Sequence, residues 1–274
     1  MIPPIALIGF GEAGSTFARA AGWRGAAWAF DIRAERAAVA DELGVNFTDR
    51  AANALAGAEL VLSLVTADAA LQVADDYARY ARPGALWCDM NSVAPETKRA
   101  TAKIVEACGA RYVDVAVLAP VEPARMAVPL LLSGPAAAAA ADALAAAGFT
   151  NLRVVGDEIG RASAIKMIRS VMVKGIEALT AEMMLAATRA GVVDEVLASL
   201  DASERAQPWP RRAAYNIERM VTHGARRAAE MEESAKTLAA LGVEPLMTRA
   251  TVQRQREQAG HPIPLTTIAQ GTGA

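Results

Sequence analysis

The sequence predicts an α/β protein, built from a doubly wound parallel sheet, a long inter-domain helix and a smaller all-α domain. Three observations support this fold class. Strand and helix patterns alternate over the first 157 residues, a glycine-rich turn follows the first strand, and strand patterns stop after Gly160. We therefore expect an α/β domain over residues 1–157, an inter-domain helix over 158–190 and an all-α domain over 191–274.

Composition and charge narrow the class of protein. The chain has 274 residues, enough for two domains, with 53% apolar and 21% charged residues. The formal net charge of −2 gives no basic field for nucleic acid, and no apolar run reaches the roughly 20 residues of a membrane span. The first residues lack the features of a signal peptide, and the two cysteines and two histidines lack metal-ligand spacing. We expect a cytoplasmic protein without a nucleic-acid, membrane or metal partner.

The first strand pattern, Ile5–Ile8, runs into a G-x-G-x-x-G turn and then into a helical pattern over Ser15–Ala21. Such glycines allow a tight turn and let the backbone approach a pyrophosphate, which sits on the positive N-terminus of the following helix. The motif predicts a Rossmann-type dinucleotide-binding domain over residues 1–157. The predicted cofactor contacts in the turn are Gly9, Phe10, Gly11, Glu12, Ala13 and Gly14.

Asp31 follows the second strand pattern, Ala26–Phe30, at the spacing of this fingerprint. An acidic residue there can accept hydrogen bonds from the adenosine ribose hydroxyls. Its charge would repel a 2′-phosphate, which favours NAD over NADP. Two alternatives stay open. Asp31 could instead cap the helix expected over Glu35–Leu43, and Arg33 or Arg36 could receive a 2′-phosphate.

The rest of the first domain continues the alternation. Strands are predicted over Leu60–Leu64, Ala85–Cys88, Arg111–Val117, Leu130–Ser133 and Leu152–Val155, and helices over Ala67–Tyr80, Pro95–Cys108 and Pro135–Ala147. Ligands of such sheets bind at the carboxyl ends of the strands. We therefore expect Val65, Thr66 and Asn91 to contact the cofactor and Ser92 to contact the substrate.

A single long helix is predicted over Gly160–Arg189, which contains no proline and repeats apolar residues at helical spacing. Lys166, Ser170 and Lys174 recur every fourth residue and so share one stripe of this helix. The patterns after it predict helices over Val192–Leu200, Pro210–Thr222, Ala225–Leu241 and Thr248–Glu257, followed by a patternless tail over Gly260–Ala274.

Four segments occur in a recognisable order: the glycine turn, DMNSVAP over Asp89–Pro95, YVDVAV over Tyr112–Val117, and Gly160 followed by Lys166. They resemble the cofactor turn, the D-x-S-T-x-S-P segment, the F-x-D-A-P-V-S-G-G loop and the G-x-x-x-x-x-K-x-x-x-N helix of the β-hydroxyacid dehydrogenases. That family includes 3-hydroxyisobutyrate and 6-phosphogluconate dehydrogenases. The resemblance implies an NAD or NADP cofactor, a homodimer and a catalytic role for Lys166.

The chain departs from the family pattern at three places. Leu118, Ala119 and Pro120 stand where the family has Ser-Gly-Gly for a substrate carboxylate, and Ser170 replaces an asparagine. Ala229–Glu230 falls on a Lys-Asp pair. We assign Leu118, Ala119, Pro120 and Ser170 to the substrate site, although Ser170 could instead bond the carbonyl of Lys166. The sequence is most similar to a bacterial subgroup whose C-terminal domain has no known function.

His223, Arg226 and Arg227 form a compact cationic cluster in a segment that resembles this subgroup. The cluster could hold a substrate carboxylate or phosphate. The alternative is a solvated helix surface whose arginines pair with the acidic residues that follow, Glu230, Glu232 and Glu233.

These features predict an NAD(P)-dependent oxidoreductase that interconverts a small hydroxy acid and its keto or semialdehyde form. Lys166 would act as general acid/base, unless it is simply an exposed surface lysine. Three other functions stay open: oxidation with decarboxylation as in 6-phosphogluconate dehydrogenase, reduction of a ketone or imine without a carboxylate, and cofactor sensing without catalysis. Apolar residues on several faces of the long helix predict a homodimer.

Overall fold

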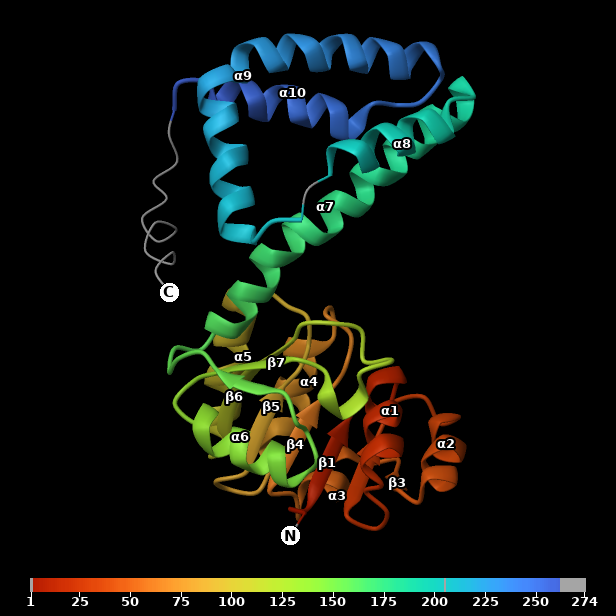
Figure 1. Ribbon diagram of the computed structural model, residues 1–274. Coiled ribbons are helices and arrows are strands. Elements are labelled where there is room, and N and C mark those ends of the chain that lie inside the picture. Colours follow the sequence, from red (N-terminus) through yellow and green to blue (C-terminus); the bar gives the residue numbers. More distant parts are fainter. Residues whose placement is uncertain (1, 205, 262–274) are drawn as a thin grey trace. The chain divides into compact units, whose positions relative to one another are not determined.

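The computed structural model describes residues 2–204 and 206–261. The chain divides into two compact units, Met1–Ser170 and Val171–Ala274. The first is an α/β unit around one sheet and the second is helical (Figure 1), so the predicted fold class is confirmed. The domain boundaries at residues 157 and 190 stay predictions. Residues 262–274 of the predicted tail lie outside the described residues.

The first unit is organised around an eight-stranded sheet of order β3-β2-β1-β4-β5-β6-β7-β8. Its strands are β1 (Ile5–Ile8), β2 (Ala27–Phe30), β3 (Asn46–Thr48), β4 (Leu60–Ser63), β5 (Leu86–Asp89), β6 (Arg111–Val117), β7 (Leu130–Ser133) and β8 (Leu152–Val154). Within this sheet only the β6–β7 pairing is antiparallel. The chain order reverses between β1 and β4, which creates the crevice where such sheets bind ligands.

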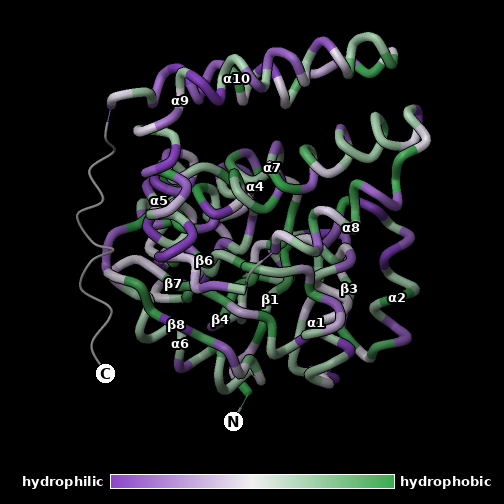
Figure 2. The backbone as a smooth tube through the Cα atoms, turned by 45° about the horizontal axis from the view of Figure 1, so that its top comes forward, coloured by the Kyte–Doolittle hydropathy of each residue, from purple (hydrophilic) through white to green (hydrophobic). Residues whose placement is uncertain are grey.

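Helices cover both faces of the sheet. They are α1 (Glu12–Ala21), α2 (Arg36–Leu43), α3 (Ala51–Leu55), α4 (Ala70–Tyr77), α5 (Pro95–Ala107) and α6 (Ala137–Ala146). Successive side chains of β1 enter different cores because a strand alternates its faces: Ile5 and Leu7 pack with α1 and α6, whereas Ala6 and Ile8 pack with α3, α4 and α5. Both faces of β1 are therefore apolar, and the tube in Figure 2 has the colour of hydrophobic residues along this strand.

The segment between α2 and β4 holds the short strand β3 and helix α3, neither of which the sequence predicted. β3 has three residues and pairs with β2, and α3 has five. Elements this short do not complete a periodic pattern, so pairing with neighbours rather than local sequence determines them.

The helical unit begins within helix α7 (Arg161–Ala190), whose residues up to Ser170 belong to the α/β unit. The prediction of one long helix is confirmed. Helices α8 (Val193–Ser203), α9 (Trp209–Ala240) and α10 (Leu246–Gln258) follow. Among the described residues, no helix combines the length and apolar character that crossing a membrane requires.

The break predicted between the helices Pro210–Thr222 and Ala225–Leu241 is wrong, because one helix, α9, spans Trp209–Ala240. Helix α9 stays hydrogen-bonded through Gly224, although Figure 1 shows that the helix bends along its course. Gly224 is buried against α10, where an added Cβ would lie 2.3 Å from the carbonyl oxygen of Gln255. The glycine therefore allows two helices to approach closely instead of ending one of them.

Candidate functional site

A cavity of about 490 Å³ lies at the carboxyl ends of β1, β2 and β4. The predicted cofactor residues that line it are Gly9, Gly11, Glu12, Asp31, Val65 and Thr66. The other predicted contacts do not line it: the side chains of Phe10 and Asn91 are buried, Ala13 packs against the core and Gly14 packs on the turn. The structure thus brings most of the predicted cofactor residues together around one opening.

The glycine turn has the geometry that a pyrophosphate requires. Gly9 has a φ of 91°, and a Cβ there would lie 2.5 Å from the carbonyl oxygen of Leu64. A Cβ on Gly14 would lie 3.0 Å from the carbonyl oxygen of Gly9. Helix α1 begins at Glu12, so its positive end adjoins the cavity. These residues fit a dinucleotide.

Asp31 stands in the cavity wall with both carboxylate oxygens engaged. Oδ2 accepts a hydrogen bond from the backbone N–H of Phe10 at 2.8 Å, and Oδ1 accepts one from the backbone N–H of Arg33 at 2.9 Å. Burial opposes ionisation, but hydrogen bonds from Arg33 and Phe10 outweigh it and hold the pKa of Asp31 below its usual value. The alternative that Asp31 caps helix α2 is wrong, because no side chain caps that helix.

The two arginines beside Asp31 have different surroundings. Arg36 donates from Nε to the carbonyl oxygen of Phe10 at 2.6 Å and from Nη2 to that of Gly11 at 3.3 Å. Its guanidinium therefore braces the glycine turn from outside the cavity wall. Arg33 lines the cavity and pairs with Asp31, Nε to Oδ1 at 3.2 Å. Of the two, Arg33 is the arginine placed to meet a 2′-phosphate.

Asn91 connects the ends of two strands. Its Oδ1 accepts a hydrogen bond from the backbone N–H of Val65 at 2.7 Å, and its Nδ2 donates to Ser63 Oγ at 3.0 Å. The side chain is buried, so in this structure it supports Val65 in the cavity wall. Direct contact between Asn91 and a cofactor stays a prediction.

Lys166 and Ser92 meet although 74 residues separate them. Ser92 follows β5, and Lys166 lies near the start of α7, where its Nζ donates to Ser92 Oγ at 2.5 Å. Lys166 is half-buried, whereas Lys174 is exposed. Lys166 therefore has a defined polar partner at the carboxyl edge of the sheet. The alternative, an exposed surface lysine, would have no such partner.

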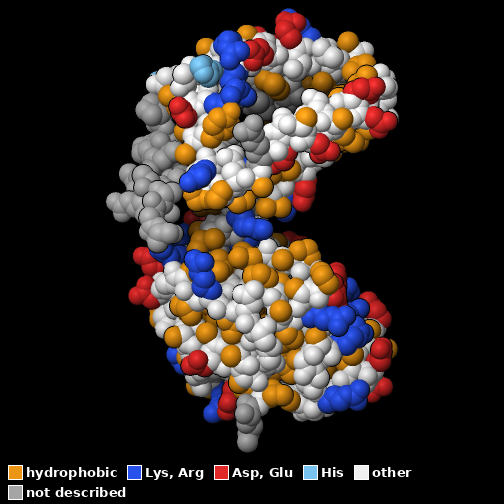
Figure 3. Space-filling view, viewed as in Figure 1, with side chains coloured by type: hydrophobic (Ala, Val, Ile, Leu, Met, Phe, Trp, Pro, Cys, Tyr) orange, Lys and Arg blue, Asp and Glu red, His pale blue; other side chains and the backbone are white. Residues whose placement is uncertain are grey.

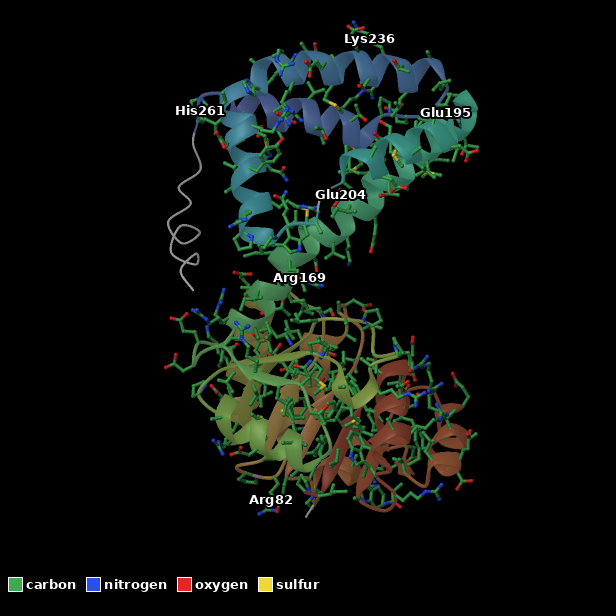
Figure 4. All side chains as sticks on the ribbon, viewed as in Figure 1. Arg82, Arg169, Glu195, Glu204, Lys236 and His261 are labelled. Atoms are coloured by element: carbon green, nitrogen blue, oxygen red, sulfur yellow. The ribbon has the colours of Figure 1, made fainter. Side chains whose placement is uncertain are left out.

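Two further contacts involve the start of α7. Ser170 Oγ donates to the carbonyl oxygen of Lys166 at 2.9 Å, which is the local bond considered as its alternative role. Arg169 Nη1 donates to the carbonyl oxygen of Leu118 at 3.1 Å, so it touches the loop that continues with exposed Ala119 and Pro120. Arg169, labelled in Figure 4, was not predicted as a site residue.

A buried charged group lies beneath the same strand ends and was also missed. Lys98 on α5 is fully buried between Asp89 and Asp114, with Nζ 3.0 Å and 3.5 Å from their carboxylate oxygens. Tyr112 donates to Asp89 Oδ2 at 2.7 Å, and burial, together with the Asp89 charge, raises the pKa of Tyr112 well above its usual value. The available signal was spacing: Lys98 shares a face of α5 with Ala102 and other buried residues.

The cationic cluster belongs to the helical unit. His223 and Arg226 are exposed on α9, and Arg226 forms an ion pair with Glu230 one turn away. This pair is the one that the alternative interpretation described. A substrate contact from His223, Arg226 or Arg227 stays a prediction. Within residues 2–204 and 206–261, no three acidic, histidine or cysteine side chains are placed to hold a metal ion.

Two family descriptions match the sequence. Residues 4–156 match the NAD binding domain of 6-phosphogluconate dehydrogenase. Residues 187–258 match a domain of unknown function, DUF1932. The first match covers the whole cavity described above.

Three solved structures illustrate the similarity. The conserved hypothetical protein from Sinorhizobium meliloti 1021 is 39% identical, with a TM-score of 0.63 over 93% of this chain and 88% of that chain. The imine reductase from Myxococcus stipitatus in complex with NADP+ has a TM-score of 0.77 at 18% identity, over 93% of each chain. The 3-hydroxyisobutyrate dehydrogenase from Salmonella typhimurium has a TM-score of 0.64 at 19% identity, over 92% of this chain and 93% of that chain.

At these low identities the two enzymes share the fold with this chain. The match to the NAD binding domain spans more than half of the sequence and agrees with the glycine turn, the cavity and Asp31. The chain therefore belongs to the β-hydroxyacid dehydrogenase family, with the NAD binding domain of 6-phosphogluconate dehydrogenase and a C-terminal domain of unknown function.

Proposed function

We propose that this protein is an NAD(P)-dependent oxidoreductase that interconverts a small hydroxy acid and its keto or semialdehyde form, with Lys166 as general acid/base. The observation that carries the proposal is the hydrogen bond between Lys166 Nζ and Ser92 Oγ at the carboxyl end of β5. Val65 and Thr66, at the end of neighbouring β4, line the predicted cofactor cavity. A nicotinamide cofactor, when bound, supplies or accepts the hydride.

The residues of the chain perform the proton transfer. In oxidation, the neutral amine of Lys166 accepts the substrate hydroxyl proton while the carbon-bound hydrogen leaves as hydride and the carbon–oxygen double bond forms; in reduction, the protonated amine returns that proton to the carbonyl oxygen. Ser92 Oγ orients Nζ through their hydrogen bond, which reduces the number of positions that the flexible lysine head samples. The Gly9–Gly14 turn and Asp31 hold the cofactor in place.

Arg169 supports a substrate that bears a carboxylate. It follows Lys166 by three residues on α7, so both side chains lie on neighbouring parts of one helix face. Its guanidinium is fixed by the carbonyl oxygen of Leu118 in the loop that replaces Ser-Gly-Gly. A planar guanidinium matches a carboxylate through two parallel hydrogen bonds, so Arg169 can take over the missing function of that loop.

Reduction of a ketone or imine without a carboxylate is a second candidate. Leu118, Ala119 and Pro120 give an apolar loop, and Pro120 has no backbone N–H to offer a carboxylate. The fold is shared with the imine reductase from Myxococcus stipitatus. Such a substrate would also use Lys166 as the proton donor.

A screen of cofactor consumption tests the proposal. Hydroxy acids, keto acids, semialdehydes, ketones and cyclic imines are each offered with both cofactors, and absorbance of the reduced nicotinamide is followed. We expect turnover with a hydroxy acid or its oxidised form. Turnover with imines alone would favour the second candidate, release of carbon dioxide would favour oxidation with decarboxylation, and cofactor binding without turnover across the panel would favour a sensor.

A further inference from the structure

We propose that Lys98 is a positioning residue for the Lys166–Ser92 pair. With Asp89 and Asp114 it forms a buried bridge, here called the Lys98 bridge, between the segment that carries Ser92 and the helix that carries Lys166. This inference rests on the proposed function, in which Lys166 moves the proton. It assigns a role to a side chain that is fully buried and cannot touch substrate.

One end of the Lys98 bridge fixes the turn that bears Ser92. Lys98 Nζ donates to the backbone carbonyl oxygen of Asp89 at 2.5 Å and to Asp89 Oδ1 at 3.0 Å. The same Oδ1 accepts the backbone N–H of Asn91 at 3.0 Å. The ammonium therefore holds both the main chain and the side chain of Asp89 at the end of β5, three residues before Ser92.

The other end fixes the first turn of α7. Asp114 Oδ2 accepts the backbone N–H of Ser163 at 2.9 Å and Ser133 Oγ at 3.1 Å, and Ser133 Oγ accepts the backbone N–H of Ala162 at 3.0 Å. A carboxylate at a helix N-terminus satisfies amides that lack helical partners. Lys166 follows Ser163 by one turn, so the direction of α7 at this point sets where its Nζ reaches.

The charges explain why one lysine serves both ends. Asp89, Asp114 and Lys98 are all fully buried, so the single ammonium is the counter-charge for two carboxylates. Without it, both carboxylates would be buried together, and the surrounding segments would have to rearrange or admit water. Either response moves the turn of Ser92 relative to the start of α7.

A double-mutant cycle in the full-length protein separates positioning from general stability. Lys98→Met is compared with the wild type and, in the Lys166→Ala background, with Lys166→Ala alone; exposed Lys103→Met on α5 is the control. We expect Lys98→Met to lower kcat roughly 10–100-fold when Lys166 is present, and less than threefold in the Lys166→Ala background. The reason is that a displaced start of α7 lowers kcat only when it carries the proton-transfer group of Lys166. Cofactor Kd and the control variant should change little.

Hydrogen exchange gives a readout independent of activity. Lys98→Met should speed exchange of the amides of Asn91, Ala162 and Ser163, and leave those of α2 unchanged. If Lys98→Met does not fold, Ser133→Ala removes only the hydroxyl between Asp114 and Ala162 and goes through the same cycle and exchange measurement.

Equal losses of kcat in both backgrounds, or unchanged exchange at these amides, would overturn the inference. If Lys166→Ala itself keeps normal kcat, the proposed function fails, and the exchange data alone then decide whether Lys98 positions these segments.

Discussion

Lys166 Nζ donates to Ser92 Oγ, and the carbonyl oxygen of Lys166 accepts a hydrogen bond from Ser170 Oγ. Lys174, two turns further along α7, is exposed and has the same chemistry. The pair Lys166 and Lys174 therefore offers a comparison in which side-chain chemistry is constant and only the position differs.

Replacing Lys166 with alanine should lower kcat by about two to four orders of magnitude, the usual contribution of general acid/base catalysis. Cofactor Kd should barely change, because we expect the glycine turn and Asp31, rather than Lys166, to hold the dinucleotide. Steady-state kinetics on the substrate found by the screen and fluorescence titration of the cofactor measure both quantities. Lys174→Ala should retain wild-type kcat. Near-normal kcat for Lys166→Ala would contradict the mechanism. Equal losses of kcat in Lys166→Ala and Lys174→Ala would instead indicate a general electrostatic effect of the two lysines on α7.

Asp31 should give a preference for NAD over NADP of at least about tenfold in kcat/KM. Hydrogen bonds from Arg33 and Phe10 keep the pKa of Asp31 low, so the carboxylate stays charged at neutral pH and repels a 2′-phosphate. Asp31→Asn keeps an acceptor for the Phe10 amide but removes the charge, and it should shift the ratio toward NADP. A wild-type preference for NADP of tenfold or more would mean that Arg33 dominates.

Local motifs point to the glycine turn, Asp31 and Lys166, because each motif is defined by near neighbours in the chain; the roles assigned to these residues stay predictions. Lys98 was not predictable in the same way. A lysine in the first turns of a helix is usually solvated, and its two carboxylates come from strands β5 and β6. Arg169 was missed for the same reason: its partner, Leu118, lies 51 residues away.

Among the elements, β1 and α7 were predictable because each has a clear apolar period, and β3 and α3 were not because they are too short. Gly224 shows that a glycine in the sequence does not by itself predict where a helix ends. A glycine within a helical pattern indicates either an end or a close contact, and only the position of α10 decides between them.

Gly224 in α9 and Gly175 in α7 should respond to alanine in opposite ways. Gly224→Ala should destabilise the protein by about 1–3 kcal/mol, because the new methyl group would overlap the carbonyl oxygen of Gln255. Gly175→Ala in α7 meets nothing within 4 Å and should stabilise by about 0.5–1 kcal/mol. Chemical denaturation of both variants measures this. Stabilisation by Gly224→Ala would contradict the close approach of α9 and α10.

Glu182 on α7 should make the stability of the helical unit depend on pH. Its carboxylate accepts the backbone N–H groups of Met247 and Thr248 at 2.8 Å and 2.9 Å, at the start of α10. Burial opposes ionisation, but these bonds and that of the Thr248 hydroxyl outweigh it and lower the pKa of Glu182. A lowered pKa means that this stabilisation is present above the unfolded value of 4.5 and is lost as pH falls through the folded value.

Glu182→Gln should therefore cost about 0.5–2 kcal/mol at neutral pH, the range for losing a helix cap, and progressively less below pH 4.5. Thermal unfolding of Glu182→Gln and of the wild type, at neutral pH and again below pH 4.5, tests this. Glu177→Gln, an exposed change on the same helix, is the control. A cost for Glu182→Gln that persists unchanged in acid would show that shape rather than charge matters.

For the whole molecule, the exposed apolar surface of α7 is the feature that most needs an explanation. Ile168, Val171 and Leu185 are 73%, 76% and 55% exposed. Hydrophobic side chains also show on the surface of the helical unit in Figure 3. In that unit, α7, α8 and α9 line an apolar hollow of about 660 Å³ that includes Met183 and Leu238. Surfaces of this kind usually pack against another chain.

We expect a homodimer in which this surface is covered. Light scattering at micromolar concentration should give twice the 28.6 kDa of one chain. Val171→Glu or Leu185→Glu should shift the mass toward the monomer, because a charge would be buried in the interface. Lys174→Glu, at an exposed polar position, is the comparison. A mass of 28.6 kDa alone for the wild type would remove this expectation.

The Lys98 bridge also limits how this sequence can evolve. Asp89, Lys98 and Asp114 lie on β5, α5 and β6, and Lys98 is the counter-charge of both buried carboxylates. Losing Lys98 first leaves two buried carboxylates without this counter-charge, whereas losing one aspartate first leaves a neutral Lys–Asp pair. We therefore expect Lys98 to persist for as long as both carboxylates do, while the exposed residues around them diverge.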